Sequence, residues 1–252
     1  MVYQKLLDGQ IALITGAGKG LGKATLEAFA KAGVAVIYAN DICVGSIDET
    51  ARQLMDMYDV KIVPMYFDVS DQDAVKQAII QIKKESGYLD TLVNNAGVMT
   101  DALIGSVTKP LIDSIYKVNV FGMMDLLQWG AKLMRKRKKG SIINLSSIVG
   151  ITGNPGQLVY SSTKGAVISM TKTAAKELAI DNIRVNAIAP GMIDTDMMRS
   201  VGEDHLQHHI NNIPFGRLGE PREIADVCVF LASDMASYLS GQVIAVDGCV
   251  LV

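Results

Sequence analysis

Short apolar runs alternate with longer amphipathic runs along the whole chain. Seven short runs, rich in β-branched residues and apolar nearly throughout, predict strands at 10–15, 34–39, 61–67, 91–95, 141–147, 183–189 and 243–248. Six amphipathic segments predict helices at 20–32, 46–58, 71–86, 109–138, 157–180 and 221–233. Such alternation is typical of a parallel sheet covered on both faces. We therefore expect an α/β fold of the Rossmann type, a doubly wound, mostly parallel seven-stranded sheet with helices on both faces.

No Pro/Ser-rich linker, repeat or low-complexity segment divides the 252 residues, so a single domain over 1–252 is expected. In doubly wound sheets, ligands bind beyond the carboxyl ends of the strands, where the strand order reverses. The residues that follow each predicted strand are therefore the candidates for chemistry.

Composition and charge narrow the partners. The formal net charge of −2 predicts no general affinity for nucleic acid or for an anionic membrane. Cys43, Cys228 and Cys249 lie far apart without CxxC spacing, which argues against disulfides and zinc and fits a reducing compartment. No apolar run is long enough to span a bilayer, and the first ten residues do not resemble a secretory signal. We expect a cytoplasmic protein.

The segment TGAGKGLGKA follows the first predicted strand and opens the first predicted helix. Gly16, Gly20 and Gly22 let the chain turn tightly and bring N–H groups close to a pyrophosphate at a helix N-terminus. Glycines also serve turns that bind nothing, so the position after the first strand is what favours a nucleotide.

Asp41, at the end of the second strand, stands where a carboxylate would meet the adenosine ribose. A carboxylate accepts hydrogen bonds from both ribose hydroxyls and repels a 2′-phosphate, which favours NAD(H). Lys19, inside the glycine turn, favours NADP(H) as the alternative. Asp41 is also suited to capping a helix or turn.

Polar residues follow the third and fourth strands as well. Asp68 is a candidate acceptor for the adenine amino group, or a cap for the helix that begins in SDQDAV. Asn94 and Asn95 are expected to satisfy backbone groups of neighbouring strands. Gly97 would let a cofactor approach the backbone closely.

Tyr160 and Lys164 lie four positions apart in the helical segment at 157–180, and therefore share one face. A nearby cation favours the phenolate, so this spacing predicts a lowered pKa for Tyr160. A half-exposed helix that merely carries both residues is the alternative. Ser147 ends the fifth strand, and strand and helix would bring it and Tyr160 to one substrate oxygen. Asn119, among apolar neighbours, predicts an opened helical turn that holds a water.

These motifs together resemble the classical short-chain dehydrogenases/reductases. The resemblance rests on TGxxxGxG at 15–22, NNAG at 94–97, Asn119, Ser147, YxxxK at 160–164 and Pro190-Gly191. It implies a general acid/base in Tyr160, a substrate-oxygen hydrogen bond from Ser147, and a water-mediated proton relay through Asn119. Lys164 would hold the nicotinamide ribose hydroxyls, while Ile193 and Thr195 would meet the carboxamide and a phosphate.

The resemblance also implies a full set of cofactor contacts. These are Thr15, Gly16, Lys19, Gly20, Leu21, Gly22, Asp41, Asp68, Val69, Asn95, Ala96, Gly97, Tyr160, Lys164, Pro190, Gly191, Ile193 and Thr195.

Within this family the chain resembles the 3-oxoacyl-[acyl-carrier-protein] reductases, which implies a 3-oxoacyl thioester substrate. Two arginines often found in that branch are replaced, one in the segment 99–101 and one at Asp181, so a secondary-alcohol, ketone, sugar or hydroxysteroid dehydrogenase stays open. A nucleotide-binding regulator without catalysis is a third reading. The basic run at 135–139 suits an acyl carrier protein or simply the end of a helix.

Three further expectations concern the assembly and the cover of the site. Residues 192–213 would form a lid over the substrate. His205, His208 and His209 lack carboxylate or cysteine partners, so no metal is expected. The helices at 109–138 and 157–180 have more apolar surface than one sheet face covers, and the family resemblance implies a homotetramer that pairs these helices and the C-terminal segments.

Overall fold

A seven-stranded parallel sheet forms the centre of the protein. The computed structural model describes residues 5–195 and 210–251. The strands are β1 (Ile11–Thr15), β2 (Val36–Asp41), β3 (Lys61–Tyr66), β4 (Thr91–Asn94), β5 (Gly140–Leu145), β6 (Ile183–Pro190) and β7 (Val243–Val246). Their order is β3-β2-β1-β4-β5-β6-β7, and each neighbouring pair is parallel. The order reverses between β1 and β4, as in a Rossmann-type fold, and the predicted fold class is confirmed.

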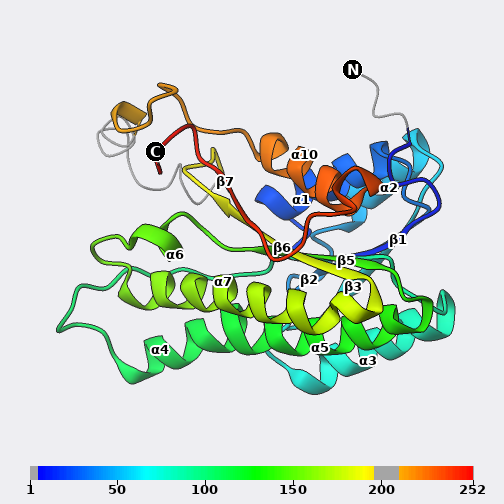
Figure 1. Cartoon of the computed structure of the whole chain (residues 1–252), viewed down its shortest axis with the longest axis horizontal. Helices are drawn as coiled ribbons and strands as arrows, with labels where there is room; N and C mark the ends of the chain where they lie inside the picture. The colour runs from blue at the N-terminus through cyan, green and yellow to red at the C-terminus, as the bar shows by residue number, and fades with distance from the viewer. Residues whose placement is uncertain (1–4, 196–209, 252) are drawn as a thin grey trace.

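Helices cover both faces of this sheet (Figure 1). One layer holds α1 (Gly20–Lys31), α2 (Asp48–Met57) and α10 (Pro221–Ala232). The other holds α3 (Gln72–Glu85), α4 (Lys109–Tyr116), α5 (Met123–Met134) and α7 (Leu158–Leu178). A one-turn helix, α6 (Val149–Thr152), connects β5 to α7.

Each face of the sheet has its own apolar core, and β1 contributes to both. Ala12 and Ile14 pack with Phe29 of α1 on one side, whereas Leu13 packs with Ile82 of α3 on the other. Successive strand residues point to opposite faces, so a strand buried on both sides is apolar at every position. This is why the strands appear as continuous apolar runs rather than as alternating patterns.

The structure departs from the sequence prediction mainly at the long helix expected at 109–138. That segment divides into α4, the π-helix η1 (Lys117–Gly122), α5 and the short helix η2 (Arg135–Arg137). The π-helix contains Asn119, so the opened turn predicted there is confirmed. The strand β2 ends at Asp41, as placed there in the sequence analysis, two residues past the apolar run 34–39. The one-turn helix α6 was not predicted.

The expectation that Asp68 caps the third helix is wrong. Asp71 caps α3, and its carboxylate accepts from the backbone N–H groups of Asp73 and Ala74. Asp68 instead closes the preceding turn, accepting from Ser70 N at 2.8 Å.

Among the described residues, no helix combines the length and the apolarity that crossing a membrane would need.

Three or more His, Cys, Asp or Glu side chains do not gather into a metal-binding group anywhere in 5–195 or 210–251. The three histidines of the sequence prediction, and most of the predicted lid at 192–213, fall in 196–209, outside the described residues.

Candidate active site

The four predicted catalytic residues meet at the carboxyl edge of the sheet. Tyr160 and Lys164 occupy the first two turns of α7, and Ser147 follows β5 by two residues. Asn119 comes from the π-helix, which packs against α7. The π-helix, the segment after β5 and the start of α7 therefore supply the site.

Lys164 is buried, and no carboxylate of the residues that the structure describes pairs with it. Its side chain is 4% exposed, and its Nζ donates to Leu145 O at 2.8 Å. The Nζ lies 5.6 Å from the centre of the Tyr160 ring. Burial disfavours the ammonium form and lowers the pKa of Lys164 from 10.5 to about 8.

Tyr160 differs from the sequence prediction of a lowered pKa. Its half-buried phenol has a raised pKa, because burial penalises the phenolate, and the nearby Ser147 hydroxyl acts in the opposite direction. Desolvation therefore outweighs the effect of the Ser147 hydroxyl. The two side chains that were expected to converge on one oxygen therefore lie close enough to influence each other.

Asn119 is fully buried and clamps the segment that follows β4. Its Oδ1 accepts from Val98 N at 2.8 Å, and its Nδ2 donates to Val98 O at 2.9 Å. A Cβ placed on Gly97 would lie 3.4 Å from Asn119 Oδ1 and 3.5 Å from Lys164 Nζ. Glycine at 97 therefore keeps open the space that Asn119 and Lys164 share.

Three residues that the sequence analysis did not single out hold α7 in place. Thr163 Oγ1 accepts from Asn119 Nδ2 at 3.1 Å and donates to Tyr160 O at 2.7 Å. Ser146 Oγ donates to Lys164 O at 2.9 Å. A Cβ on Gly150 of α6 would stand 2.7 Å from the Lys164 carbonyl carbon, so α6 packs directly on α7. Thr163 directly precedes Lys164 in the sequence, and Ser146 directly precedes Ser147. A hydroxyl residue next to a predicted catalytic residue is the sequence signal that could have identified both.

The glycine turn after β1 forms a cradle without side chains. Gly16 and Gly20 have φ of +64° and +54°, and a Cβ on Gly22 would stand 1.9 Å from Gly16 O. Lys19 precedes α1 without capping it through its side chain, and Leu21 packs on the core. An uncapped helix N-terminus with close-approaching backbone fits a pyrophosphate.

Thr15 ties this cradle to the end of β4. Its Oγ1 accepts from Asn95 N at 3.0 Å and from Ala96 N at 3.1 Å. Asn95 Nδ2 donates in return to Thr15 O at 2.9 Å and Gly16 O at 3.1 Å. Asn95 therefore satisfies a neighbouring strand as predicted. Asn94 instead donates to the side chain of Asn144 at 2.9 Å.

Asp41 lies beside the glycine turn and is fixed by two backbone donors. Gly18 N donates to its Oδ2 at 2.9 Å and Cys43 N to its Oδ1 at 3.0 Å. Asp41 therefore caps a turn, as the alternative predicted. These two hydrogen bonds hold its carboxylate against the glycine cradle. Val69, after β3, is buried; a Cβ on Gly122 would stand 2.4 Å from its carbonyl oxygen.

The residues after β6 complete the edge. Ile148 N donates to Pro190 O at 3.0 Å, and Gly191 N donates to Val246 O at 3.0 Å. Ile193 is 7% exposed. The Thr195 methyl carbon lies 3.8 Å from the position of a Cβ on Gly20. The two ends of the predicted cofactor site, β1 and β6, thus face each other across the edge.

The sheet order, with a glycine cradle at its switch point, defines a dinucleotide-binding protein. A family model described as "Enoyl-(Acyl carrier protein) reductase" matches residues 16–250. The 3-oxoacyl-[acyl-carrier-protein] reductase FabG of Thermotoga maritima is 44% identical over 96% of this chain and 98% of its own length. The enzyme of that name from Aquifex aeolicus is 39% identical, covering 96% and 97%. A 3alpha-hydroxysteroid dehydrogenase of Mediterraneibacter gnavus is likewise 39% identical, covering 96% and 97%.

The chain belongs to the short-chain dehydrogenase/reductase family. It is an oxidoreductase that acts on a keto or secondary hydroxyl group with a nicotinamide cofactor.

Proposed function

We propose that the protein reduces a 3-oxoacyl thioester, using Tyr160 as the proton donor. The observation that carries this proposal is the Tyr160–Lys164 pair, a phenol with a raised pKa beside a buried ammonium with a lowered one. A phenol that stays protonated at neutral pH is the form that can donate to a carbonyl oxygen as it gains electrons. The names of the 3-oxoacyl-[acyl-carrier-protein] reductases among the relatives support the substrate class.

The side chains divide the chemistry among them. The nicotinamide, when bound, supplies the hydride. Ser147 donates a hydrogen bond to the substrate oxygen and stabilises the charge that develops there. Tyr160 gives its proton to that oxygen, and Lys164, poised near pH 8, holds the ribose hydroxyls and returns a proton. Asn119 keeps the segment after β4 in place and holds the water that leads to solvent.

NAD(H) is the proposed cofactor, with NADP(H) as the alternative. Asp41 presents a carboxylate fixed at the rim of the glycine cradle, which repels a 2′-phosphate. Lys19 is exposed on the same turn. Fluorescence titration measures the preference, and tighter binding of NADH is expected. Tighter binding of NADPH would indicate that Lys19, rather than Asp41, determines the cofactor preference.

An acyl carrier protein is a proposed partner, but the basic run at 135–139 is poorly suited to receive it. Arg135 pairs with Asp181 at 2.7 Å, and Arg137 pairs with Asp90 at 3.1 Å. The run also precedes β5, and therefore lies at the amino edge of the sheet, opposite Ser147. The Arg135–Asp181 pair accounts for the aspartate that replaces a family arginine.

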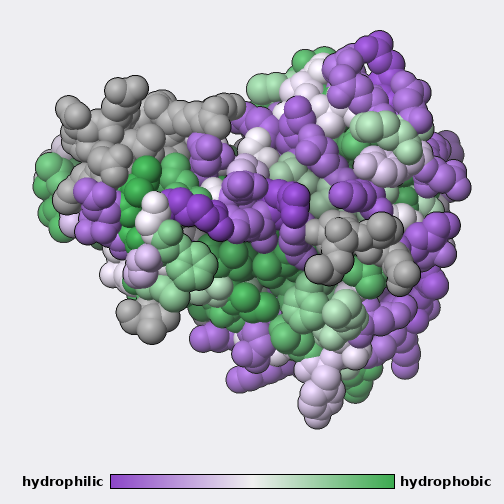
Figure 2. Space-filling view, turned by 90° about the horizontal axis from the view of Figure 1, so that it is seen from above, coloured by the Kyte–Doolittle hydropathy of each residue, from purple (hydrophilic) through white to green (hydrophobic). Residues whose placement is uncertain are grey.

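We further propose a homotetramer in the cytoplasm. Phe121 and Met124, on η1 and α5, are 54% and 40% exposed, and Met235 and Tyr238 near β7 are 68% and 104% exposed. Apolar residues also gather on the face seen from above, which carries α1, α10 and β7 (Figure 2). Two separate apolar faces suit the two interfaces of a tetramer with closed symmetry. Sedimentation showing a monomer at micromolar concentration would contradict this.

A hydroxysteroid dehydrogenase is the second candidate, because one relative carries that name. Anaerobic mixing of protein and NADH with a short 3-oxoacyl thioester, followed by the absorbance of the reduced nicotinamide, tests the proposal. Turnover is expected there and not with 3-oxosteroids; the reverse preference would favour the second candidate. Cofactor binding without turnover on any carbonyl substrate would indicate a regulator.

A further inference from the structure

The segment after β6, residues 192–195, is paired with the loop that leads into α10. Asp194 N donates to Gly219 O at 2.8 Å, and Gly219 N donates to Met192 O at 2.9 Å. Ile193 and Gly219 form an isolated parallel bridge. A Cβ on Gly219 would stand 2.6 Å from Ile193 Cδ1, so this approach requires glycine. The position of the segment therefore depends on the position of Gly219.

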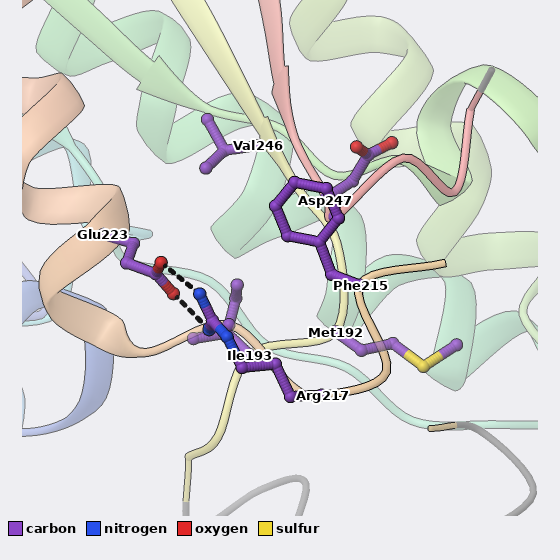
Figure 3. Close-up of a pocket in the computed structure, with 9 residues that line it drawn as sticks. Met192, Ile193, Phe215, Arg217, Glu223, Val246 and Asp247 are labelled. Atoms are coloured by element: carbon purple, nitrogen blue, oxygen red, sulfur yellow. Dashed lines mark hydrogen bonds and ion pairs between the residues drawn. The ribbon is translucent and has the colours of Figure 1, made fainter. Parts of the chain in front are cut away.

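Gly219 is held from both sides by a single carboxylate, that of Glu223. Arg217 makes a bidentate ion pair with Glu223, at 2.9 and 2.8 Å (Figure 3). Glu220 N donates to Glu223 Oε2 at 2.7 Å. Arg217 also donates to Leu218 O at 2.9 Å. The residues that flank Gly219 are thus fixed to the first turn of α10.

The first turn of α10 is a firm base for these contacts. Pro221 occupies the first turn, and Glu220 and Glu223 form a capping box. Ile224, one residue beyond Glu223, is fully buried, and α10 packs along α1, the helix that the glycine cradle opens. The ion pair therefore links the loop to the same helical layer that carries the pyrophosphate turn.

We propose that Arg217 and Glu223 are positioning residues for the nicotinamide end of the cofactor. They fix Gly219, whose backbone pairs with the segment that holds Ile193 and leads into Thr195. Those two residues are the ones expected to meet the carboxamide and a phosphate. This inference rests on the proposed cofactor contacts of those two residues. The adenine end, at Asp41 and the third strand, has no contact with the Arg217–Glu223 pair.

Two ligands separate the two ends. NADH reports on the whole site, whereas AMP has an adenosine and one phosphate but no nicotinamide. Arg217→Met and Glu223→Gln are each expected to weaken NADH binding about fivefold, which corresponds to the roughly 1 kcal/mol that an exposed ion pair contributes. AMP binding is expected to change less than about twofold. The KM for NADH is expected to rise while kcat falls less.

The matched control is Arg222→Met. Arg222 is the neighbouring arginine on α10 and pairs with Asp226 at 3.6 Å, without reaching Gly219. This variant is expected to bind NADH and AMP as the wild type does. Arg217→Lys keeps the charge but not the fork geometry. Its loss of NADH binding free energy is expected to be about half of the loss in Arg217→Met.

The outcomes are distinct. NADH affinity unchanged in both Arg217→Met and Glu223→Gln overturns the inference, and so do equal losses of NADH and AMP affinity, which would indicate general damage to the fold. Should Arg217→Met fail to fold by circular dichroism, Arg217→Lys and Glu223→Gln give the same comparison. A wild-type protein that binds no NADH would instead contradict the proposed function.

Discussion

The start of α7 and the loop before α10 shift the pKa values of their side chains for opposite reasons. Lys164 is 4% exposed and pairs with no carboxylate in 5–195 or 210–251, so burial lowers its pKa to about 8. The Glu223 side chain is 40% exposed, and its pKa falls to about 2 because Arg217 and the Glu220 N–H bind its charged form. One shift penalises the charge that is present at neutral pH, and the other favours it.

This difference separates a reactive group from a structural one. A buried ammonium costs folding free energy, which a protein retains where the charge has chemistry to perform. An exposed ion pair contributes modestly to stability and stays ionised at every pH at which the protein works. Both pKa values fall, to about 8 and to about 2, so the cause of the shift, rather than its direction, distinguishes the two regions.

The largest expected effect is that of Tyr160→Phe, which removes the proton donor at the α7 region. Proton transfer by a positioned side chain contributes about 10²- to 10⁴-fold, and turnover should fall by about 1,000-fold. The ring remains, so NADH affinity should change less than about threefold. Steady-state rates and fluorescence titration measure the two quantities.

The matching variant in the other region, Glu223→Gln, should change kcat by far less. Turnover of Tyr160→Phe within a factor of ten of the wild type would show that the phenol is not the donor. The α7 region could then not be called the reactive one of the two regions.

Lys164→Met should abolish turnover and yet stabilise the fold. A pKa of about 8 against an unfolded value of 10.5 corresponds to about 3 kcal/mol of penalty at neutral pH. Loss of the hydrogen bond to Leu145 O offsets about 1 kcal/mol, which leaves a gain of about 2 kcal/mol. Urea unfolding at pH 7 measures it.

The pH dependence of this gain follows from the direction of the shift. Because the folded wild type releases its proton more readily than the unfolded chain, its penalty is full below pH 8 and fades between about pH 8 and 10.5. The advantage of Lys164→Met should therefore shrink in this window. A variant that is less stable than the wild type at pH 7 would contradict the uncompensated burial of Lys164.

Thr163→Val tests the link between the π-helix and α7. The change removes the hydroxyl that accepts from Asn119 Nδ2 and donates to Tyr160 O, and it leaves a buried amide proton without a partner, at about 1–3 kcal/mol. Turnover should fall about tenfold. Thr163→Ser keeps the hydroxyl and should retain most of the rate. Equal losses in both variants would assign Thr163 to packing alone.

Most of the fold could be predicted from the sequence because its strands are buried on both faces. β1 is apolar at every position but its last and is bounded by polar or glycine-rich turns, so its limits follow from composition alone. The residues of the site could be predicted for a related reason. Parallel strands end at one edge, and polar residues after several strands must therefore meet there.

The supporting contacts could not be predicted in this way. The bond from Ser146 to Lys164 O and the approach of Gly150 to α7 depend on how α6 lies, and α6 is a single turn without a periodic pattern. The pKa of Tyr160 is raised rather than lowered as predicted, because the spacing in the sequence reveals the nearby cation but not the desolvation of the phenol. Nothing in the sequence indicates that Arg217 and Glu223 pair with each other beside Gly219.

The smallest expected effect is the loss of acid-dependent stability in Glu223→Gln. The folded pKa of about 2 lies below the ordinary 4.5, so the wild type gains stability that is present above pH 4.5 and is lost as the pH falls toward 2. Because the side chains of the pair are 52% and 40% exposed, solvent screening reduces the gain to about 1 kcal/mol. Urea unfolding at fixed protein concentration should show this deficit at pH 7 and a smaller one near pH 3. In about 1 M salt, where the screening length is about 3 Å, the deficit should shrink as well, whereas the gain in Lys164→Met should persist because solvent ions do not reach a buried ammonium. A Glu223→Gln deficit that ignores both pH and salt would show that the carboxylate acts through shape rather than charge, and the contrast between the two regions would fail.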